Sequence, residues 1–284
     1  MSYTGGLCNK IFCLSADIHH ALNDRQTISE PIFGWNRKIK FSEIFDIEYF
    51  NKSVFKLTGF DNIICDQLGT KRRDLWSKSE ALVKKQRQSN ILSPKDALYI
   101  TLVSLKPSPT IITHMTTNSF DIGIHVRLES DWIPYATHNE RKIRGNIFLV
   151  NESTISHMIK EMFGNKNTIF ISTGMNHDRV AENLKNNGLH SDIHFFHDKN
   201  LEYEQNAYLN FLTLISCNVF VGNSRSTFSN LVTMTRCIQQ NNHENYIYNA
   251  TMSKLAKRVD FGVHCDPEKV ENNVVMFTNE TSDN

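Results

Sequence analysis

Long apolar runs are missing from this chain of 284 residues, although 40% of its residues are hydrophobic. A helix needs roughly twenty consecutive apolar residues to span a bilayer, so the sequence predicts no membrane-spanning segment. The first residues, Met1–Gly6, also lack the charged start and apolar stretch of a signal peptide. We therefore expect a cytoplasmic protein, unless a leader has been removed from the natural chain.

An excess of charge of one sign is also missing, because 31 Lys and Arg residues are balanced by 30 Asp and Glu residues. A dedicated nucleic-acid-binding protein usually carries a strong basic excess, so we expect no nucleic-acid partner. The densest basic runs lie in the polar stretch Gly69–Asn90. This stretch is typical of an exposed helix, and a solvated helix face explains its charges better than a binding patch does.

Cysteine is sparse, and none of the six cysteines forms a Cys-x-x-Cys pair. We expect reduced, mostly buried thiols rather than a disulfide framework. Three histidines, His190, His194 and His197, lie close together in the sequence. Their spacing does not match a helix-borne zinc motif, and strand alternation would place His194 and His197 on opposite faces. We therefore expect no metal site.

Strands and helices alternate through the second half of the chain. Apolar runs predict four strands, at Asp121–Val126, Thr168–Ser172, Ile193–Phe196 and Val219–Val221. Periodic segments predict four helices, at Asn151–Phe163, His177–Asn187, Glu204–Ser216 and Ser226–Gln239. This alternation implies a parallel sheet with right-handed crossovers, and hence one Rossmann-like domain.

The first half of the chain is less regular. Periodicity predicts a helix at Asn9–Leu22, and an aromatic-rich stretch at Phe41–Phe50 supplies core residues. The pattern Ser93-Pro94 is typical of a helix start, and that helix must end before Pro107-Ser108-Pro109. We place the domain connection at these prolines, which gives an N-terminal domain at 1–108 and a C-terminal domain at 109–284.

The stretch from Asp121 to Trp132 is an apolar strand that ends abruptly in charge. Arg127, Glu129 and Asp131 follow the strand at alternating positions. Ligands of open α/β sheets collect at the carboxyl ends of the strands, and the planar fork of a guanidinium suits a phosphate. The pattern indicates a site for a phosphorylated ligand, with Arg127 as its main candidate. A purely structural ion pair between Arg127 and either carboxylate is the alternative.

Two further segments place polar turns next to helix starts. The strand Val219–Val221 runs into Gly222-Asn223 and a hydroxyl-rich turn that begins the helix at Ser226. Ser and Thr cap helices, and the free N–H groups of a helix start attract anions. Near the beginning of the chain, Gly5–Asn9 forms a glycine turn that leads into a helix. The structural alternatives are an ordinary capped turn at Ser226 and a helix N-cap at Asn9.

Together these three segments resemble the motifs of the fucosyltransferase superfamily that uses GDP-fucose, which comprises protein O-fucosyltransferases and α-1,2- and α-1,6-fucosyltransferases. Members carry an N-terminal Gly-rich turn with an Asn, a strand ending in His-x-Arg, and a late Gly-Asn-Ser-x-Ser turn. Here these are Gly5–Asn9, His125–Arg127 and Gly222–Ser226. The segment His125–Trp132 is most similar to the O-fucosyltransferase version, whereas Gly5–Phe12 is more similar to the α-1,2 version.

The resemblance implies an α/β, GT-B-like fold with two Rossmann-like lobes facing a cleft. The smaller N-terminal lobe, 1–108, would bind the acceptor, and the C-terminal lobe, 109–284, would bind the nucleotide sugar. The implied activity is an inverting transfer of fucose from GDP-fucose to a glycan or protein hydroxyl. The donor is a substrate, so no cofactor is expected. Two alternatives remain: the same scaffold using another nucleotide sugar, for example a UDP-sugar, and a non-catalytic module that binds nucleotides or carbohydrates.

Departure of a diphosphate from such a donor places negative charge on the leaving group, which a metal ion or fixed donors must stabilise. The sequence contains no Asp-x-Asp motif, the usual metal-holding pair of metal-dependent glycosyltransferases. We therefore expect a metal-independent reaction, in which Arg127 and the start of the helix at Ser226 act in place of a metal.

The candidate site residues come from the resemblance and from the rule that ligands bind at the carboxyl ends of the strands, here called the strand-end rule. The catalytic candidates are Arg127, Asn9 and His125. The donor-binding candidates are Gly5, Gly6, Glu129, Asp131, Thr173, Gly174, Asp198, Asn223, Ser224, Ser226, Thr227 and Phe228. Phe228 is equally compatible with a place in the core. No catalytic base stands out, and the candidates are Glu30, Glu129, Asp131 and His114.

Overall fold

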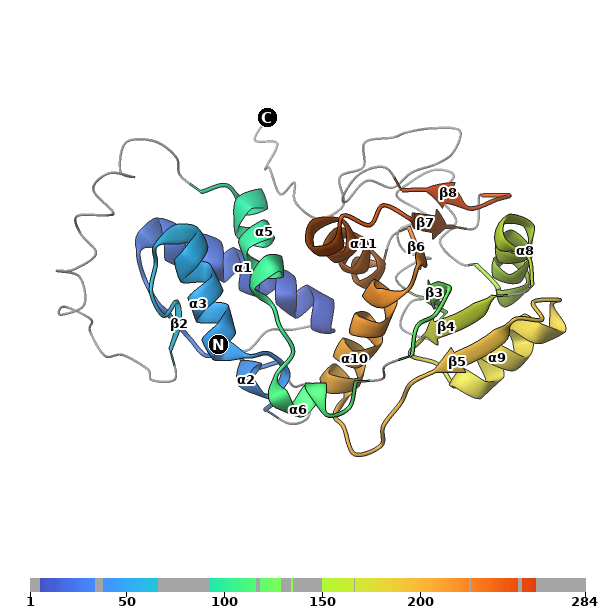
Figure 1. The fold of residues 1–284 in the computed structure, drawn as a ribbon, viewed down its shortest axis with the longest axis horizontal. Helices are drawn as coiled ribbons and strands as arrows, with labels where there is room; N and C mark the ends of the chain where they lie inside the picture. Colours follow the sequence, from blue (N-terminus) through green and yellow to red (C-terminus); the bar gives the residue numbers. More distant parts are fainter. Residues whose placement is uncertain are drawn as a thin grey trace. The chain divides into compact units, whose positions relative to one another are not determined.

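A computed structural model of the chain describes residues 6–33, 38–65, 92–115, 118–128, 134, 150–165, 167–224, 226–249 and 252–258. The chain forms two compact units, whose elements are labelled in Figure 1. The first unit comprises residues 1–115 together with 201–208, and the second comprises 116–200 together with 209–284. One helix, α10 (Tyr203–Ser216), therefore begins in the first unit and ends in the second.

The first unit is mostly helical. Its described helices are α1 (Leu7–Asp24), α2 (Phe41–Ile44), α3 (Ile47–Thr58), α5 (Pro94–Ser104) and α6 (Pro109–Ile112). Two short strands, β1 (Ile28–Ser29) and β2 (Ile64–Cys65), pair in parallel. In the described part of this unit, that pair alone represents the Rossmann-like sheet expected for the N-terminal lobe.

Local side-chain bonds explain where two of these helices begin. At the start of α5 the Ser93 hydroxyl accepts from the Asp96 N–H, and the Asp96 carboxylate accepts from the Ser93 N–H. This capping box, with Pro94 in the first helical position, confirms the predicted helix start. The Asp46 carboxylate caps α3 in the same way by accepting from the Tyr49 N–H at 2.9 Å.

A cluster of buried aromatic rings forms the centre of the first unit. It consists of Phe33, Phe41, Phe45, Phe50 and Tyr208. The ring centroids of Phe45 and Tyr208 are 4.6 Å apart, so α10 contributes directly to this core.

A buried ion pair lies in the same unit. The Lys10 ammonium, in the first turn of α1, donates to the Glu204 carboxylate at 2.6 Å and to the Phe33 carbonyl oxygen. Both side chains are almost fully buried. A buried charge is strongly unfavourable unless it is paired and hydrogen-bonded, so this pair ties the first turn of α1 to the first turn of α10.

The segment Pro107-Ser108-Pro109 lies inside the first unit. Pro107 forms an antiparallel bridge with Phe45, and the Ser108 N–H donates to the Ile44 carbonyl oxygen at 2.9 Å. Ser108 then caps α6 through its side chain. The helix α5 ends at Ser104, ahead of the prolines as the sequence predicts, but the division between the units follows residue 115 rather than 108.

The second unit is built around a six-stranded sheet in the order β5-β4-β3-β6-β7-β8. The strands are β3 (Ile122–His125), β4 (Thr168–Ser172), β5 (Asp192–Phe195), β6 (Val219–Asn223), β7 (Asn245–Tyr248) and β8 (Ala256–Lys257). Neighbouring strands are parallel except for β7 and β8. With β3 counted as the first strand, this is the Rossmann order 3-2-1-4-5-6. The four predicted strands are confirmed, and β7 and β8 are additional.

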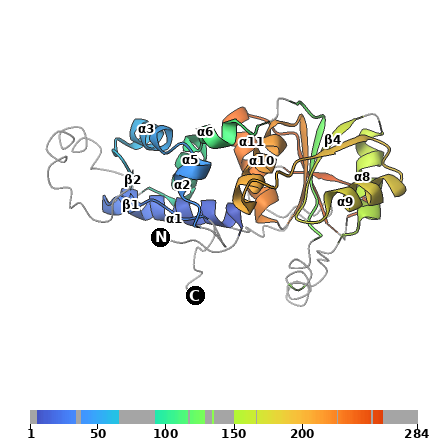
Figure 2. The same cartoon turned by 90° about the horizontal axis from the view of Figure 1, so that it is seen from below.

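Helices cover both faces of this sheet. The helices α8 (Glu152–Phe163) and α9 (His177–Asn186) lie on one face, and α10 and α11 (Thr227–Gln240) lie on the other, as Figure 2 shows. This follows from right-handed crossovers. The chain moves outward from β3 through β4 to β5 along one face, and then returns to β6 along the opposite face.

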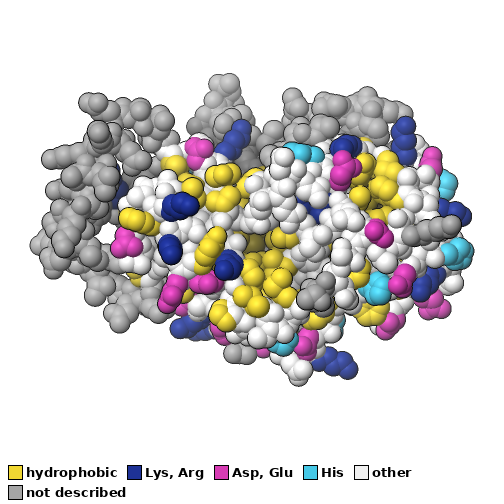
Figure 3. Space-filling view, viewed as in Figure 1, with side chains coloured by type: hydrophobic (Ala, Val, Ile, Leu, Met, Phe, Trp, Pro, Cys, Tyr) yellow, Lys and Arg dark blue, Asp and Glu magenta, His cyan; other side chains and the backbone are white. Residues whose placement is uncertain are grey.

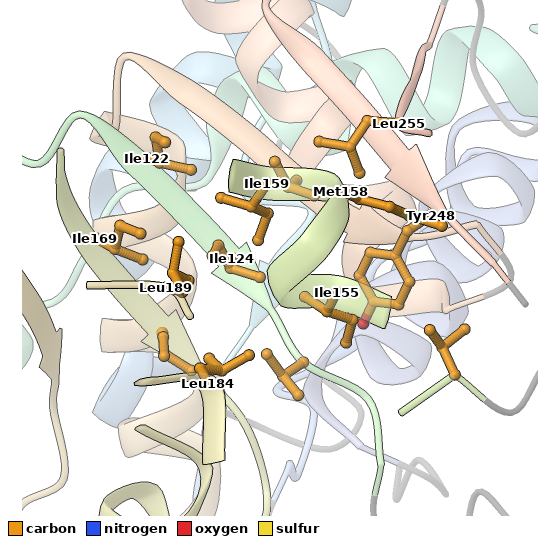
Figure 4. Close-up of a cluster of buried hydrophobic side chains, with 14 of the residues drawn as sticks. Ile122, Ile124, Ile155, Met158, Ile159, Ile169, Leu184, Leu189, Tyr248 and Leu255 are labelled. Carbon is orange, nitrogen blue, oxygen red and sulfur yellow. The ribbon is translucent and has the colours of Figure 1, made fainter. Parts of the chain in front are cut away.

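Aliphatic side chains fill the space between the sheet and the α8–α9 layer. Ile122 and Ile124 of β3 belong to one buried cluster with Ile155 and Ile159 of α8 (Figure 4). The cluster extends to the neighbouring elements through Ile169, Leu184, Leu189 and Tyr248. All four residues of β3 are buried, which explains why this strand reads as a near-continuous apolar run.

A fully buried arginine holds together the ends of three elements in the second unit. The Arg236 guanidinium of α11 donates to the carbonyl oxygens of Leu214, Ile215, Cys217, Asn218 and Glu244 and to Asn245 Oδ1. The last carbonyls of a helix have no partner within the helix. Arg236 satisfies two of those of α10, at Leu214 and Ile215, and joins them to Asn218 and Glu244, which precede β6 and β7.

The surface carries mixed charges. On the face shown in Figure 3, Lys and Arg side chains are interspersed with Asp and Glu side chains. The cysteines that the structure describes are free thiols, but only Cys8 and Cys217 are buried, so the expectation of mostly buried thiols is wrong for the described part of the chain. Of the described helices, none combines the length and apolar character needed to cross a membrane.

Candidate functional site at the carboxyl edge of the sheet

The carboxyl ends of β3 and β6 meet where the strand order of the second unit reverses. The two strands pair in parallel, with Ile122 opposite Val219 and Ile124 opposite Val221. The chain leaves them toward opposite faces of the sheet, to α8 and α11. Open α/β sheets bind ligands in the crevice that such a switch point creates. The topology therefore brings the predicted segments His125–Arg127 and Asn223–Phe228 to one part of the sheet edge.

His125 ends β3 as a buried and uncharged side chain. Its Nδ1 is hydrogen-bonded to the Ser229 hydroxyl of α11 at 2.8 Å, and its ring centroid lies 4.6 Å from that of Phe228. Burial, reinforced by the positive charge of Arg127, lowers the pKa of His125 to about 3. A group with this pKa does not exchange a proton near neutrality. These contacts favour a positioning role for His125, in which it holds the start of α11 against β3.

Acidification is expected to destabilise the protein through His125. A histidine in the unfolded chain titrates near 6.5, whereas the pKa in the folded state is about 3. Between these values the unfolded chain binds a proton that the folded protein does not, so stability falls as the pH drops below about 6.5. The contribution of His125 is a loss of about 1.4 kcal/mol between pH of about 7.5 and 5.5.

Urea denaturation of the wild type and of His125→Asn at both pH values measures this contribution. The variant should lose less stability on acidification than the wild type does, because other titrating groups are common to both. Equal losses in the two proteins would contradict the assigned pKa.

Tyr248 of β7 fixes the backbone that follows His125. Its fully buried hydroxyl donates to the His125 carbonyl oxygen at 2.8 Å and lies 3.2 Å from the Arg127 N–H, which donates to it. The Tyr248 carbonyl oxygen also accepts from the Ser224 N–H at 3.1 Å. One residue thus holds the ends of both β3 and β6. Tyr248 is not among the predicted site residues, because β7 was not predicted.

The first turn of α11 lies very close to β6. Ser226 occupies the N-cap position, and its side chain makes no capping bond. A Cβ atom on Gly222 would lie only 2.6 Å from the Ser229 Cβ, so a glycine is required for this approach. The helix therefore begins at the carboxyl end of β6, where its N–H groups and dipole favour an anion.

Two buried side chains beside this turn lack hydrogen-bond partners within the described part of the chain. They are Ser224, through its hydroxyl, and Asn230, through both atoms of its amide. Helical side chains lean toward the helix N-terminus, so Asn230 leans toward Ser226. Buried polar groups are normally satisfied, and these atoms favour a polar ligand here. The helical spacing of Ser226, Ser229 and Asn230 could have indicated this face from the sequence.

The ring of Phe228 is half-buried and has aromatic neighbours. Its centroid lies 4.6 Å from that of His125 and 6.0 Å from that of Phe211 in α10. Thr227 precedes it as the first residue of α11 and is also half-buried. Phe228 therefore helps to hold the start of α11, and packing accounts for part of its role.

The other predicted residues of the second unit follow β4 and β5 along the same edge. Thr173 and Gly174 come directly after β4, and Thr173 Oγ1 accepts from the Met175 N–H at 3.2 Å. Asp198 follows β5 and accepts from the Asn200 N–H at 2.8 Å. Because β4 neighbours β3 and β5 lies one strand further out, these residues are progressively farther from the switch point.

Gly6 and Asn9 belong to the first unit. Gly6 is the N-cap of α1, and Asn9 lies exposed in the first turn of that helix. The structural alternative for Asn9, a helix N-cap, is therefore wrong, because α1 begins earlier, at Leu7. The remaining predicted residues, Gly5, Glu129 and Asp131, lie outside the described residues.

Among the candidate bases, Glu30 has a structural role. Its Oε1 accepts from the Ser42 N–H at 2.8 Å, its Oε2 lies 3.8 Å from Lys40 Nζ, and its side chain is only 6% exposed. His114 belongs to the turn after α6. In the described part of the chain, no group of three or more His, Cys, Asp or Glu side chains is arranged to hold a metal ion.

Two solved structures that share this fold are POFUT1 and the fucosyltransferase NodZ. POFUT1 in complex with GDP-fucose aligns with a TM-score of 0.54 and 14% identity over 86% of this chain and 95% of that one. The fucosyltransferase NodZ from Bradyrhizobium aligns with a TM-score of 0.51 and 13% identity over 90% and 96%. Neither a protein-family model nor a curated protein matches the sequence. At this level of identity the likeness is one of fold alone: the chain shares an α/β fold with parallel strands with these two structures.

Proposed function

We propose that this protein is an inverting, metal-independent glycosyltransferase that transfers fucose from GDP-fucose to a glycan or protein hydroxyl. The observation that carries the proposal is the parallel pairing of β3 with β6 at the switch point. It places the His125–Arg127 segment and the start of α11 at one edge, where a diphosphate would meet a guanidinium and a helix N-terminus together. The fold shared with POFUT1, solved with GDP-fucose, supports this donor.

The chemistry proposed for this edge is charge stabilisation. As the sugar–phosphate bond breaks, negative charge develops on the departing diphosphate. Arg127 would bind it through charge-assisted hydrogen bonds. The first N–H groups of α11 and the hydroxyls of Ser224 and Ser226 would bind further oxygens. These fixed donors make a metal ion unnecessary, in agreement with the lack of an Asp-x-Asp motif in the sequence.

The acceptor side of the proposal rests on the first unit. The Gly5–Asn9 turn resembles the superfamily's N-terminal motif, and the exposed amide of Asn9 is available to a polar substrate. The buried pair Lys10–Glu204 adjoins Asn9 in sequence and holds this turn of α1 in place. The acceptor hydroxyl would attack the face of the donor sugar opposite the departing diphosphate. This attack would invert the configuration of the sugar carbon that was bonded to the diphosphate.

A nucleotide screen tests the donor. Thermal unfolding is measured with GDP, UDP and GDP-fucose, and a ligand at a hundredfold excess over its dissociation constant should stabilise the protein by roughly 2.7 kcal/mol. Stabilisation by GDP but not by UDP is expected. Stabilisation by UDP alone would indicate a UDP-sugar as the donor instead of GDP-fucose. Stabilisation by neither nucleotide would overturn nucleotide binding.

Turnover tests the enzymatic part of the proposal. Release of GDP from GDP-fucose is measured with a panel of glycan and peptide acceptors, before and after excess EDTA. Activity should survive EDTA. Loss of activity that Mn²⁺ restores would overturn the metal-independent mechanism, and GDP-fucose binding without turnover on any acceptor would instead favour a non-catalytic binding module.

A further inference from the structure

The strand β5 is more exposed to solvent than the strands inside the sheet. It lies at the border of the sheet opposite β8, and among the described residues its one neighbouring strand is β4 (Figure 1). None of its four residues is buried, whereas all four residues of β3 are. The Phe195 side chain is 40% exposed, although large aromatic side chains are normally well buried. An edge strand of this kind can pair with a strand of another chain.

The pairing of β5 with β4 shows which backbone groups of β5 point outward. The Asp192 N–H donates to the Asn167 carbonyl oxygen at 3.2 Å, so the backbone polar groups of Asp192 face β4. These groups alternate in direction along a strand, and those of His194 therefore also face β4. The N–H and C=O groups of Ile193 and Phe195 point away from the sheet. They form a short row of donors and acceptors for a second strand.

The side chains of β5 differ in character between its two faces. Asp192 and His194 share one face, where the Asp192 carboxylate and His194 Nε2 are 2.9 Å apart and the side chains are 70% and 42% exposed. Ile193 and Phe195 share the other face, where the Phe195 ring stacks on His177 of α9. A strand with an acidic and a basic group two positions apart is complementary to a copy of itself that runs in the opposite direction.

Charge selects one register for two antiparallel copies of β5. The outward groups bond to each other only where Ile193 or Phe195 lies opposite Ile193 or Phe195 of the second copy. With Ile193 opposite Ile193, each Asp192 lies opposite a His194. With Ile193 opposite Phe195, the two His194 side chains lie opposite each other instead. With Phe195 opposite Phe195, each His194 lies opposite Phe196. The first register alone pairs opposite charges, which stabilises a strand pair.

We propose that β5 is the interface of a symmetric dimer, in which it pairs antiparallel with β5 of a second copy and Ile193 lies opposite Ile193. A two-fold axis makes every contact occur twice, so the pair of Asp192 with His194 forms in both directions. On the other face, Phe195 of one copy lies diagonally across from Ile193 of the other, within reach of an aromatic side chain. Only a few residues pair, so the interface is small and the dimer should dissociate on dilution.

Sedimentation velocity over a range of protein concentrations measures the dimer, and two variants of Ile193 test the strand pair. Ile193→Pro removes an outward N–H that β4 does not use, so it is compatible with an edge strand and should abolish dimerisation. Ile193→Ala is the matched control, because it shortens the same side chain but keeps the N–H, and it should still dimerise. A protein that is monomeric at every concentration would overturn the proposal, as would a dimer that Ile193→Pro leaves unchanged.

A charge exchange tests the register. Asp192→His places two basic groups opposite each other in both directions, and should weaken dimerisation by about 2- to 30-fold. The double variant Asp192→His, His194→Asp restores opposite charges across the pair and should recover the affinity. If the double variant were weakened as much as the single one, these side chains would not lie opposite each other.

Disulfide formation tests the register independently, and it decides the matter if Ile193→Pro does not fold. Ile193→Cys should give a covalent dimer under oxidising conditions, because Cα atoms opposite each other are about 5.5 Å apart, a separation that suits a disulfide. Phe195→Cys is its control, because the two new thiols would be offset by four residues, or about 13 Å, and should not link. The wild type controls for the native thiols. Linking of Phe195→Cys but not of Ile193→Cys would overturn the register.

Discussion

Replacing Arg127 with alanine is expected to weaken GDP binding or fucose transfer by roughly 10- to 150-fold, with little change in the free energy of unfolding. Arg127 is half-buried directly beyond β3, and its backbone N–H is held by Tyr248. The substitution keeps that backbone bond and removes the guanidinium. A hydrogen bond to a charged group contributes about 1.5–3 kcal/mol, which corresponds to the expected loss.

Two further variants make this test specific. Arg127→Lys keeps the charge but loses the planar fork of the guanidinium. Its GDP affinity and transfer rate should therefore lie between those of the wild type and of Arg127→Ala. Arg179→Ala removes an exposed arginine from α9 in the same unit and should bind GDP normally. Transfer by Arg127→Ala at the wild-type rate would show that the phosphate site has been misplaced.

Replacing Arg236 with methionine is expected to lower the free energy of unfolding by at least about 3 kcal/mol. The guanidinium donates to five carbonyl oxygens and to Asn245 Oδ1, and the bond to the Asn245 side chain is 2.7 Å long. Methionine approximates the length of the side chain but offers no donor. Several buried acceptors at the end of α10 would lose their partner together, and each such loss is unfavourable.

Urea denaturation measures the Arg236→Met effect, and two controls define its cause. Arg236→Lys supplies one ammonium in place of a five-donor fork, so it should recover only part of the loss. Arg179→Met makes the same chemical change at an exposed position, where substitutions usually stay within about 0.5 kcal/mol. If Arg236→Met were as stable as Arg179→Met, the bonds of Arg236 would not hold these elements together.

The sheet was predictable where strands are covered on both faces. Such strands are continuous apolar runs, and β3, β4 and β6 therefore stand out in the sequence. β7 does not, because Asn245–Tyr248 has only four residues and a single aliphatic one, Ile247, and β8 has two residues. The prolines at 107 and 109 ended a helix as expected. They did not mark the division between units, since that division depends on tertiary contacts rather than on local backbone restriction.

The candidate site was predictable where it depends on residues that are neighbours in the sequence. Arg127 and Ser226 directly follow strands, so the strand-end rule finds them. Ser229 and Tyr248 could not be found in this way, because they bond to His125 from 104 and 123 positions away in the sequence. Their partners are decided by the strand order β3-β6-β7, which no local pattern specifies.

The Tyr248 hydroxyl makes the end of β3 a preorganised surface. The carbonyl of His125 and the N–H of Arg127 are already bonded to it before any ligand arrives. Ordering a mobile side chain on binding costs about 0.5–1.5 kcal/mol. A backbone segment that is already fixed loses no comparable free energy when a ligand binds. This edge should therefore act as a rigid receptor for an anion, and the rate of capture should depend on diffusion and charge.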